Sequence, residues 1–387
     1  MEADVEIDRF CSIVFYLLIA MITCLMAHRI SNNNQYEPCF VNGRRTRESF
    51  NNRLFLTGIF VVLFLCSALR FDIGHDYWKY TQTAHEIYVG GYVVTEIGFN
   101  TIVKMIYGLC GFECYELVFA LFAFVTIIIF LKALYRQSSN FSWSFFLFMT
   151  FGLYFQTFNT IRYYLALAIV LYSMKYVLNK DWIGFIFLII IAALFHKSVL
   201  LVIPVYWIAT FEWKKSHIIA GFVLSALCFV GQKLILKLAL IFYPSYKNTV
   251  YLEGSDTVSS IFRIAIILAL YIWFIQYKGE DLKKMRRYKE LRFYGQLNIL
   301  AFVVCVFFSF LPVVTRIVYY FSVSQLVMIP LIIDNIDNAV LKKCIERIVC
   351  LACIAYFVVF LLQAHENGVG LLPYRSWLFE AERYIFK

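Results

Sequence analysis

One short segment of the sequence gathers several side chains that could do chemistry. Between residues 70 and 80 the chain reads Arg70-Phe-Asp72-Ile-Gly74-His75-Asp76-Tyr77-Trp78-Lys79-Tyr80. The segment combines cations, carboxylates, an imidazole, aromatic rings and a glycine that permits a tight turn. A carboxylate or an imidazole can take a proton from a hydroxyl group. An interfacial loop with an aromatic belt would have a similar composition, so both interpretations remain open.

Arginines recur at the ends of apolar segments or in the C-terminal tail, namely Arg70, Arg162, Arg316 and Arg375. Cations at one depth repel each other unless they share anions, which are either acids such as Asp72, Asp76 and Glu96 or an anionic ligand. Guanidinium groups bind phosphate bidentately, and a phosphate at headgroup depth belongs to a lipid phosphate or pyrophosphate. Snorkelling to the interface is the alternative for a single arginine such as Arg316.

Two histidines have a sequence context that suits a base. His196 follows Phe195 at the end of an apolar segment, and His75 lies within residues 70–80. Each could equally be a structural hydrogen-bonding residue. The chain lacks a Gly-rich phosphate loop, a Walker lysine, His-Glu-x-x-His and an Asp-x-Asp pair, so neither a cytosolic nucleotide substrate nor a metal or cofactor is expected.

These side chains must be positioned by membrane helices, since 62% of the residues are hydrophobic and only 16% are charged. We expect an all-α polytopic fold in one membrane domain, residues 1–387, with about twelve crossings. Residues 95–111, which are apolar but short, are expected to be re-entrant or interfacial. The predicted spans are 10–27, 54–69, 115–135, 143–158, 160–178, 182–195, 198–211, 218–231, 261–277, 293–311, 313–333 and 348–362.

Basic residues are distributed unevenly between the two predicted sides. Alternate loops hold 21 of the 35 Lys and Arg but 10 of the 25 Asp and Glu, and the positive-inside rule makes this side cytoplasmic. We attribute the net charge of +10 to this topology and expect no nucleic-acid partner. Both termini are then expected outside, together with the long segments 70–114 and 232–260 and the tail 363–387.

The ordered set of motifs resembles the EpsG family of membrane proteins, which is related to the Wzy-type polymerases of exopolysaccharide, capsule and O-antigen synthesis. The similarity covers about residues 50 to 330. It rests on Arg70-x-x-x-Gly74-x-Asp76-x-x-x-Tyr80, Glu96-Ile-Gly-Phe99, Asn159-x-x-Arg162, Phe195-His196 with Pro204, and Arg316-Ile-Val-Tyr-Tyr320. Tyr163 stands where such proteins commonly have Gln, so no role is transferred to it.

The resemblance implies a GT-C/Wzy-like fold and a polymerase in the bacterial cytoplasmic membrane whose active site faces away from the cytoplasm. Its donor would be a growing glycan on undecaprenyl pyrophosphate, and its acceptor a lipid-linked repeat unit. Arginines holding the pyrophosphate could replace a metal and a general acid, and single displacement would invert the anomeric carbon. A flippase and a chain-length regulator of the same pathway are expected partners.

We assign provisional roles on this basis. Asp76 is the proposed general base with His196 as its rival, while Arg70 and Glu96 order the outer loop around the catalytic residues. Arg162 and Arg316 are expected to bind the pyrophosphate. Further substrate contacts are expected from Asn159, Tyr80, Tyr320 and Arg375. A flippase of lipid-linked oligosaccharide, a glycan ligase and an O-acyltransferase are the alternative functions.

Overall fold

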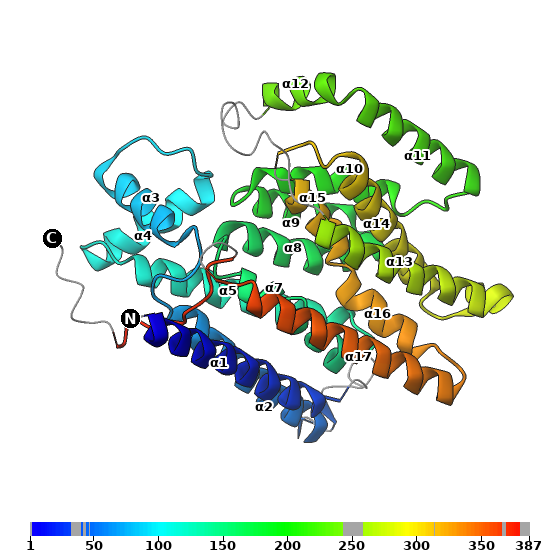
Figure 1. The fold of residues 1–387 in the computed structure, drawn as a ribbon, viewed down its shortest axis with the longest axis horizontal. Coiled ribbons are helices and arrows are strands. Elements are labelled where there is room, and N and C mark those ends of the chain that lie inside the picture. Colours follow the sequence, from blue (N-terminus) through cyan, green and yellow to red (C-terminus); the bar gives the residue numbers. More distant parts are fainter. Residues whose placement is uncertain are drawn as a thin grey trace. The chain divides into compact units, whose positions relative to one another are not determined.

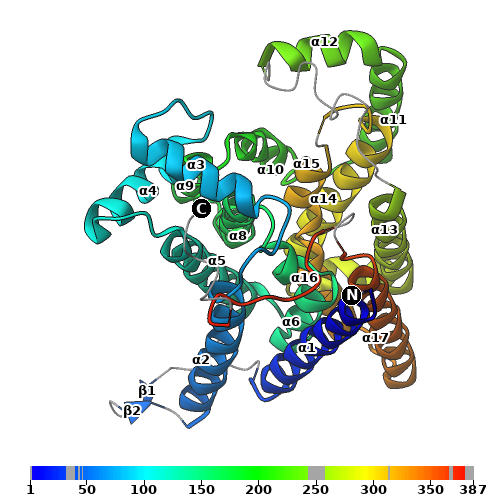
Figure 2. The same cartoon turned by 60° about the vertical axis from the view of Figure 1, so that its left-hand side comes forward.

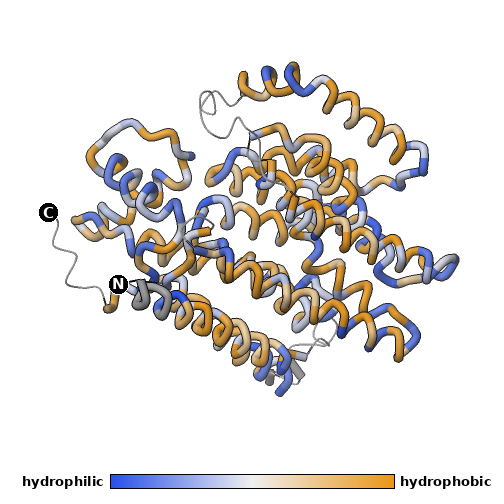
Figure 3. The backbone as a smooth tube through the Cα atoms, in the orientation of Figure 1, coloured by the Kyte–Doolittle hydropathy of each residue, from blue (hydrophilic) through white to orange (hydrophobic). Residues whose placement is uncertain are grey.

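Figure 1 shows the helices of the computed structural model, and the described part of the chain adds one short hairpin to them. It describes residues 2–31, 40–41, 44–45, 47–242, 258–312, 314–365 and 369–379. The hairpin pairs β1 (Phe40–Val41) with β2 (Arg44–Arg45) in antiparallel register. Along the long helices, hydrophobic residues fill the middle and hydrophilic residues gather at the ends (Figure 3). The predicted class, a polytopic helical membrane protein, is confirmed.

Within the described ranges, eight helical segments are long and apolar enough to cross a bilayer, or nine if one bent pair forms a single span. The long segments are α1 (Glu2–His28), α2 (Arg47–Ala68), α5 (Tyr115–Gln137), α8 (Ile161–Leu178), α13 (Val258–Lys278) with η5 (Gly279–Lys284), α14 (Tyr288–Phe307), α15 (Val314–Ser322) with α16 (Gln325–Asp334), and α17 (Ala339–Leu362). The predicted count of about twelve crossings is therefore not confirmed.

The other predicted spans are shorter or broken helices. The bent pair turns by 83° at Gly231, and Gly152 interrupts the segment 143–158 with a φ of +70°. These elements are α6 (Phe141–Thr150) with α7 (Leu153–Gln156), α9 (Trp182–Ala193), η2 (Lys197–Leu201) with α10 (Val202–Ile208), and α11 (Lys215–Val230) with α12 (Gln232–Phe242).

The predicted outer segment 70–114 forms α3 (Tyr77–Val89) and α4 (Ile97–Cys110). With 14 residues, α4 is shorter than the about 20 that a perpendicular crossing needs. Parts of the two other predicted outer segments, residues 243–257, 366–368 and 380–387, lie outside the described residues.

Residue contacts divide the chain into two compact units. The first comprises Met1–Tyr172, Ile191–Lys197 and Ile333–Lys387, and the second comprises Ser173–Ile190 and Ser198–Ile332. In the first unit α1 packs on α2 and α6, α2 on α5, and α3 on α4. In the second unit α14 packs on α11, α13 and α15. The expectation of a single membrane domain stays a prediction.

The C-terminal segment returns to the first two helices of the first unit (Figure 2). The Tyr16 hydroxyl donates to the carbonyl oxygen of Leu371 (2.9 Å), and the Tyr374 hydroxyl donates to that of Cys66 (3.0 Å). Ser376 then forms an isolated β-bridge with Arg70. The segment therefore fixes the point where the chain leaves α2.

A buried polar network holds the break between α15 and α16 in the second unit. The Asn298 amide donates to Ser324 Oγ (2.9 Å), and the Gln325 amide donates to Asn298 Oδ1 (2.7 Å). All three side chains are buried. Polar groups without water must find partners within the protein, so this network stabilises the non-helical residues at the break.

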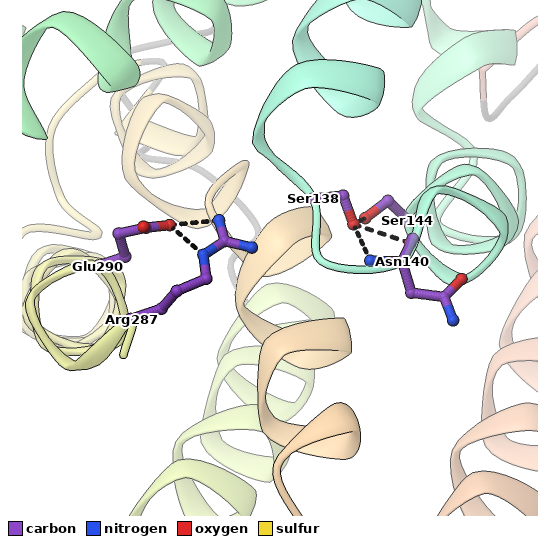
Figure 4. Close-up of polar contacts among 5 residues, drawn as sticks. All are labelled: Ser138, Asn140, Ser144, Arg287 and Glu290. Carbon is purple, nitrogen blue, oxygen red and sulfur yellow. Dashed lines mark hydrogen bonds and ion pairs between the residues drawn. The ribbon is translucent and has the colours of Figure 1, made fainter. Parts of the chain in front are cut away.

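Two turns at helix ends are held by local polar contacts, one in each unit (Figure 4). In the first unit, Ser138 Oγ accepts from the backbone N–H of Asn140 (3.0 Å), just before α6, and from the hydroxyl of Ser144 (2.5 Å) in its first turn. In the second unit, Arg287 Nε donates to Glu290 Oε2 (2.7 Å) at the beginning of α14. The first turn thus gives a backbone N–H at a helix end a partner, and the second is held by an ion pair between side chains.

Candidate functional site

Gly74 lets the loop after α2 pass between two other segments of the first unit. Its φ is +95°, and a Cβ there would lie 2.8 Å from the carbonyl oxygen of Phe158. Its amide donates to the carbonyl oxygen of Gly370 (2.8 Å). Only glycine combines this backbone conformation with so close an approach. The loop is thus held between the residues before α8 and the C-terminal segment.

Arg70 is buried and anchors the same loop. Its guanidinium donates to the carbonyl oxygens of Ser67 (2.5 Å) and Phe158 (3.4 Å), and it lies 5.0 Å from the ring centroid of Phe119. Burial lowers the pKa of Arg70, but a guanidinium remains charged at neutral pH. Arg70 therefore links the end of α2 to the residues before α8, and its role in ordering the loop around the catalytic residues stays a prediction.

Arg375, an expected substrate contact, lies at the edge of this loop. Its guanidinium is 3.5 Å from Asp72 Oδ2, and both side chains are partly exposed. Asp72 Oδ1 also accepts from the Trp78 indole N–H (2.5 Å). The charge of Arg375 is therefore partly compensated by the Asp72 carboxylate.

Asp76 lies at the beginning of α3, beside the beginning of α8. Its amide N–H donates to Asn159 Oδ1 (3.2 Å). The Asp76 side chain does not cap α3, and among the described residues its half-buried carboxylate has no ion-pair partner. The carboxylate is therefore available to another group.

Glu96 and Arg162 form an ion pair between the beginnings of α4 and α8. Their side chains are 15% and 20% exposed, respectively. The Arg162 guanidinium lies over the rings of Tyr80 (5.5 Å) and Phe99 (5.4 Å), both of which are buried. Tyr80 thus supports Arg162 from one turn beyond Asp76. The two aromatic faces and the carboxylate orient the cation.

The turn that carries His196 packs against the beginning of α4. The Gly98 amide donates to the carbonyl oxygen of Leu194 (2.8 Å), and the Lys197 amide donates to Glu96 Oε1 (3.4 Å). The His196 ring lies edge-on to Tyr163, with centroids 5.2 Å apart. His196 is therefore in the same neighbourhood as the Glu96–Arg162 pair.

Three helices of the first unit consequently begin near one another, since Asp76 touches Asn159 and Glu96 pairs with Arg162. A helix N-terminus carries partial positive charge and free N–H groups, which favour anions. Neither Asp76 nor Glu96 caps its helix through its side chain. We name Asp76, Glu96, Asn159, Arg162 and His196 the N-terminal cluster. It combines a cation, a carboxylate without an ion pair and an imidazole.

The remaining expected residues, Arg316 and Tyr320, lie on α15 in the second unit. Arg316 is half-buried. Tyr320 is fully buried, its hydroxyl lies 3.1 Å from Ser198 Oγ, and its carbonyl oxygen accepts from the Tyr206 hydroxyl (2.6 Å). Tyr320 thus packs within the second unit.

Arg263 was missed by sequence reasoning. It is buried in α13, with its guanidinium 5.3 Å from the ring centroid of Tyr319. The available signal was its position, because it is the only charged residue between Val258 and Tyr277. An ionisable residue within an apolar span suggests function or a specific partner.

Within the described ranges, no three His, Cys, Asp or Glu side chains come close enough together to hold a metal ion. No curated protein and no solved structure matches the chain. The model of the EpsG family matches residues 53–376. This match begins in α2, ends at the residue that bridges to Arg70, and includes the whole N-terminal cluster. The chain therefore belongs to the EpsG family, which comprises Wzy-like polymerases.

Proposed function

We propose that this protein polymerises a glycan at the extracytoplasmic face of the bacterial cytoplasmic membrane. In the proposed reaction, it transfers a growing glycan from undecaprenyl pyrophosphate to a lipid-linked repeat unit. Membership of the EpsG family supports the general activity of a Wzy-like polymerase. The convergence of three helix beginnings in the N-terminal cluster carries the assignment of the site.

The proposed step is a single displacement. A hydroxyl oxygen of the acceptor sugar attacks the anomeric carbon of the donor glycan, while the bond from that carbon to the pyrophosphate oxygen breaks. Undecaprenyl pyrophosphate leaves with the bonding electrons, and the hydroxyl proton passes to a base of the protein. The new glycosidic bond has the inverted configuration.

Asp76 is the better supported base of the two carboxylates in the cluster. The Glu96 carboxylate is engaged by Arg162 in an ion pair and so serves to orient that cation. The Asp76 carboxylate has no ion-pair partner among the described residues. His196 remains the rival base because its turn packs against Glu96.

Arg162 is suited to the developing charge on the pyrophosphate. Its guanidinium is partly exposed and is oriented by Glu96 and two aromatic rings before any ligand binds. Preorganised positive charge stabilises a leaving anion without reorganisation, and the beginnings of α3, α4 and α8 add partial positive charge. The proposal that Arg316 also binds the pyrophosphate rests on the sequence.

The experiment that tests this function is polymerisation by the purified protein in liposomes that contain lipid-linked repeat units. We expect a ladder of glycans of increasing length on lipid, with inverted anomeric configuration by NMR. Movement of unextended repeat units across the bilayer without a ladder would establish a flippase instead. Transfer of single units to an acceptor without lipid would establish a ligase.

A further inference from the structure

A groove of about 730 Å³ lies between α11, α13 and α14 in the second unit. Most of its wall is apolar, including Phe222, Leu268, Ile272, Ile299 and Phe302. Helices of a membrane protein bury such walls against one another or against lipid chains. The groove therefore offers an apolar ligand a long contact surface.

Polar residues line the other part of the groove. Arg292 pairs with Glu212 and donates to the carbonyl oxygen of Thr210 (3.0 Å), so most of its charge is compensated. Lys283 also lines the groove, is exposed, and has no ion-pair partner among the described residues. This end of the groove thus carries an uncompensated positive charge.

The loop that contains Lys283 carries further positive charge. Residues 278–292 hold seven Lys and Arg but three Asp and Glu. Two of the three acids are engaged nearby, since Asp281 pairs with Lys284 and Glu290 pairs with Arg287. A phosphate at Lys283 would therefore lie in a region of net positive charge.

The length of the groove matches one leaflet of a bilayer. Its residues on α13 extend from Ala265 to Ile275, which corresponds to about 15 Å at about 1.5 Å per residue. The hydrocarbon core is about 30 Å thick, so one leaflet is about 15 Å deep. A chain lying along α13 from the charged end would end near the bilayer centre.

We propose that this groove binds one glycerophospholipid with an anionic headgroup. The phosphate lies at Lys283, and an acyl chain lies along α13 between α11 and α14. Charge complementarity selects the headgroup, and the one-leaflet length favours an ordinary acyl chain over a polyprenyl chain. The proposed lipid is separate from the glycan donor and acceptor, and its binding does not depend on the proposed reaction.

Native mass spectrometry of the full chain tests the headgroup contact, with phosphatidylglycerol and phosphatidylcholine that carry identical acyl chains as probes. We expect tighter binding of phosphatidylglycerol. Lys283→Gln should weaken that binding about fivefold, the change expected for one lysine near a charged lipid. It should weaken phosphatidylcholine binding less, because the choline cation offsets the charge of that lipid's phosphate. Lys284→Gln is the matched control, because Lys284 pairs with Asp281 and does not line the groove.

A second pair of variants tests the acyl-chain contact. Ala269→Trp places a bulky ring in the groove and should abolish the binding of both lipids, whereas Ile266→Trp, at an exposed position of α13 outside the lining, should not. Equal binding of the two lipids, or no effect of Lys283→Gln, would overturn the proposal. Displacement of phosphatidylglycerol by a lower concentration of undecaprenyl phosphate would assign the groove to the polyprenyl lipid instead.

Discussion

Asp76 and Glu96 are carboxylates at the beginnings of neighbouring helices, but they have different partners. Glu96 is paired with Arg162, whereas Asp76 meets Asn159 only through its backbone amide. The Asp76 carboxylate has no ion-pair partner among the described residues. At the residue scale, the proposed chemistry therefore divides between Glu96, which orients a cation, and Asp76, which is available for proton transfer.

Asp76→Asn should reduce the polymerisation rate by about 10²–10⁴-fold, because the amide cannot accept the proton of the acceptor hydroxyl. The rate of ladder formation by purified protein measures the effect. Asp72→Asn is the matched control and should change the rate less than about fivefold, since its contact with Arg375 is a partly exposed ion pair. A normal rate in Asp76→Asn combined with inactivity of His196→Gln would assign the base to His196.

Glu96→Gln and Arg162→Ala should act on the same step. Loss of the Arg162 charge is expected to lower the polymerisation rate by about 10²–10³-fold. Glu96→Gln should lower the rate by a smaller factor, because the Arg162 guanidinium remains. The double variant should be no slower than Arg162→Ala alone, because each change removes the same interaction. Rates from a double-mutant cycle test this expectation. Additive losses would show that the two residues act independently.

At the scale of elements, α4 connects the loop after α2 to the turn that carries His196. The expectation that this segment is re-entrant or interfacial stays a prediction. Arg70, Asp76 and Arg162 belong to the same unit, and Glu96 at the beginning of α4 pairs with Arg162. The position of this short helix therefore decides whether the cluster forms.

Two glycines of α4 provide a matched test of that position. A Cβ at Gly98 would lie 2.7 Å from the carbonyl oxygen of Leu194, whereas a Cβ at Gly108 would meet nothing within 4 Å. Gly98→Ala should push α4 away from the His196 turn and lower both the rate and the melting temperature. Gly108→Ala should keep the rate and raise stability by up to about 1 kcal/mol through helix propensity. If both variants had the same rate and melting temperature, the contact between α4 and Leu194 would not be what holds α4 against the His196 turn.

At the scale of the whole molecule, the distribution of Lys and Arg predicts the orientation in the membrane. By the positive-inside rule, we expect the proposed site to lie outside and loop 278–292 to lie in the cytoplasm. Tyr92 precedes α4 in the predicted outer segment and is 90% exposed, so it can report on the outer side. Lys283 in loop 278–292 is also exposed and can report on the opposite side.

A membrane-impermeant maleimide applied to intact cells should label Tyr92→Cys but not Lys283→Cys in a cysteine-free background. Lys283→Cys should become reactive only after the membrane is permeabilised. The mass shift of the purified protein measures the labelling. Labelling of Lys283→Cys alone in intact cells would reverse the proposed orientation and place the N-terminal cluster on the cytoplasmic side.

Composition and residue order were enough to predict a helical membrane protein and its family, and to mark candidate residues for the site. The transfer of side chains into lipid depends on their types alone, so apolar runs predict helices reliably. The predicted count of about twelve crossings is not confirmed, because hydropathy does not show that Gly152 interrupts one segment or that α9 has only 12 residues. Arg263 was overlooked for a related reason, since a single cation hardly changes the mean hydropathy of a span.

The partners of the charged residues depend on contacts between distant parts of the chain. Spacing marked Arg70 as a candidate, and folding showed that its guanidinium is buried against Ser67 and Phe158. Glu96 and Arg162 are 66 positions apart, and they meet because α4 packs beside the turn that follows α9. Residue types and their order therefore predict which groups are available, whereas the packing of the helices determines which of them pair and which remain available for the reaction.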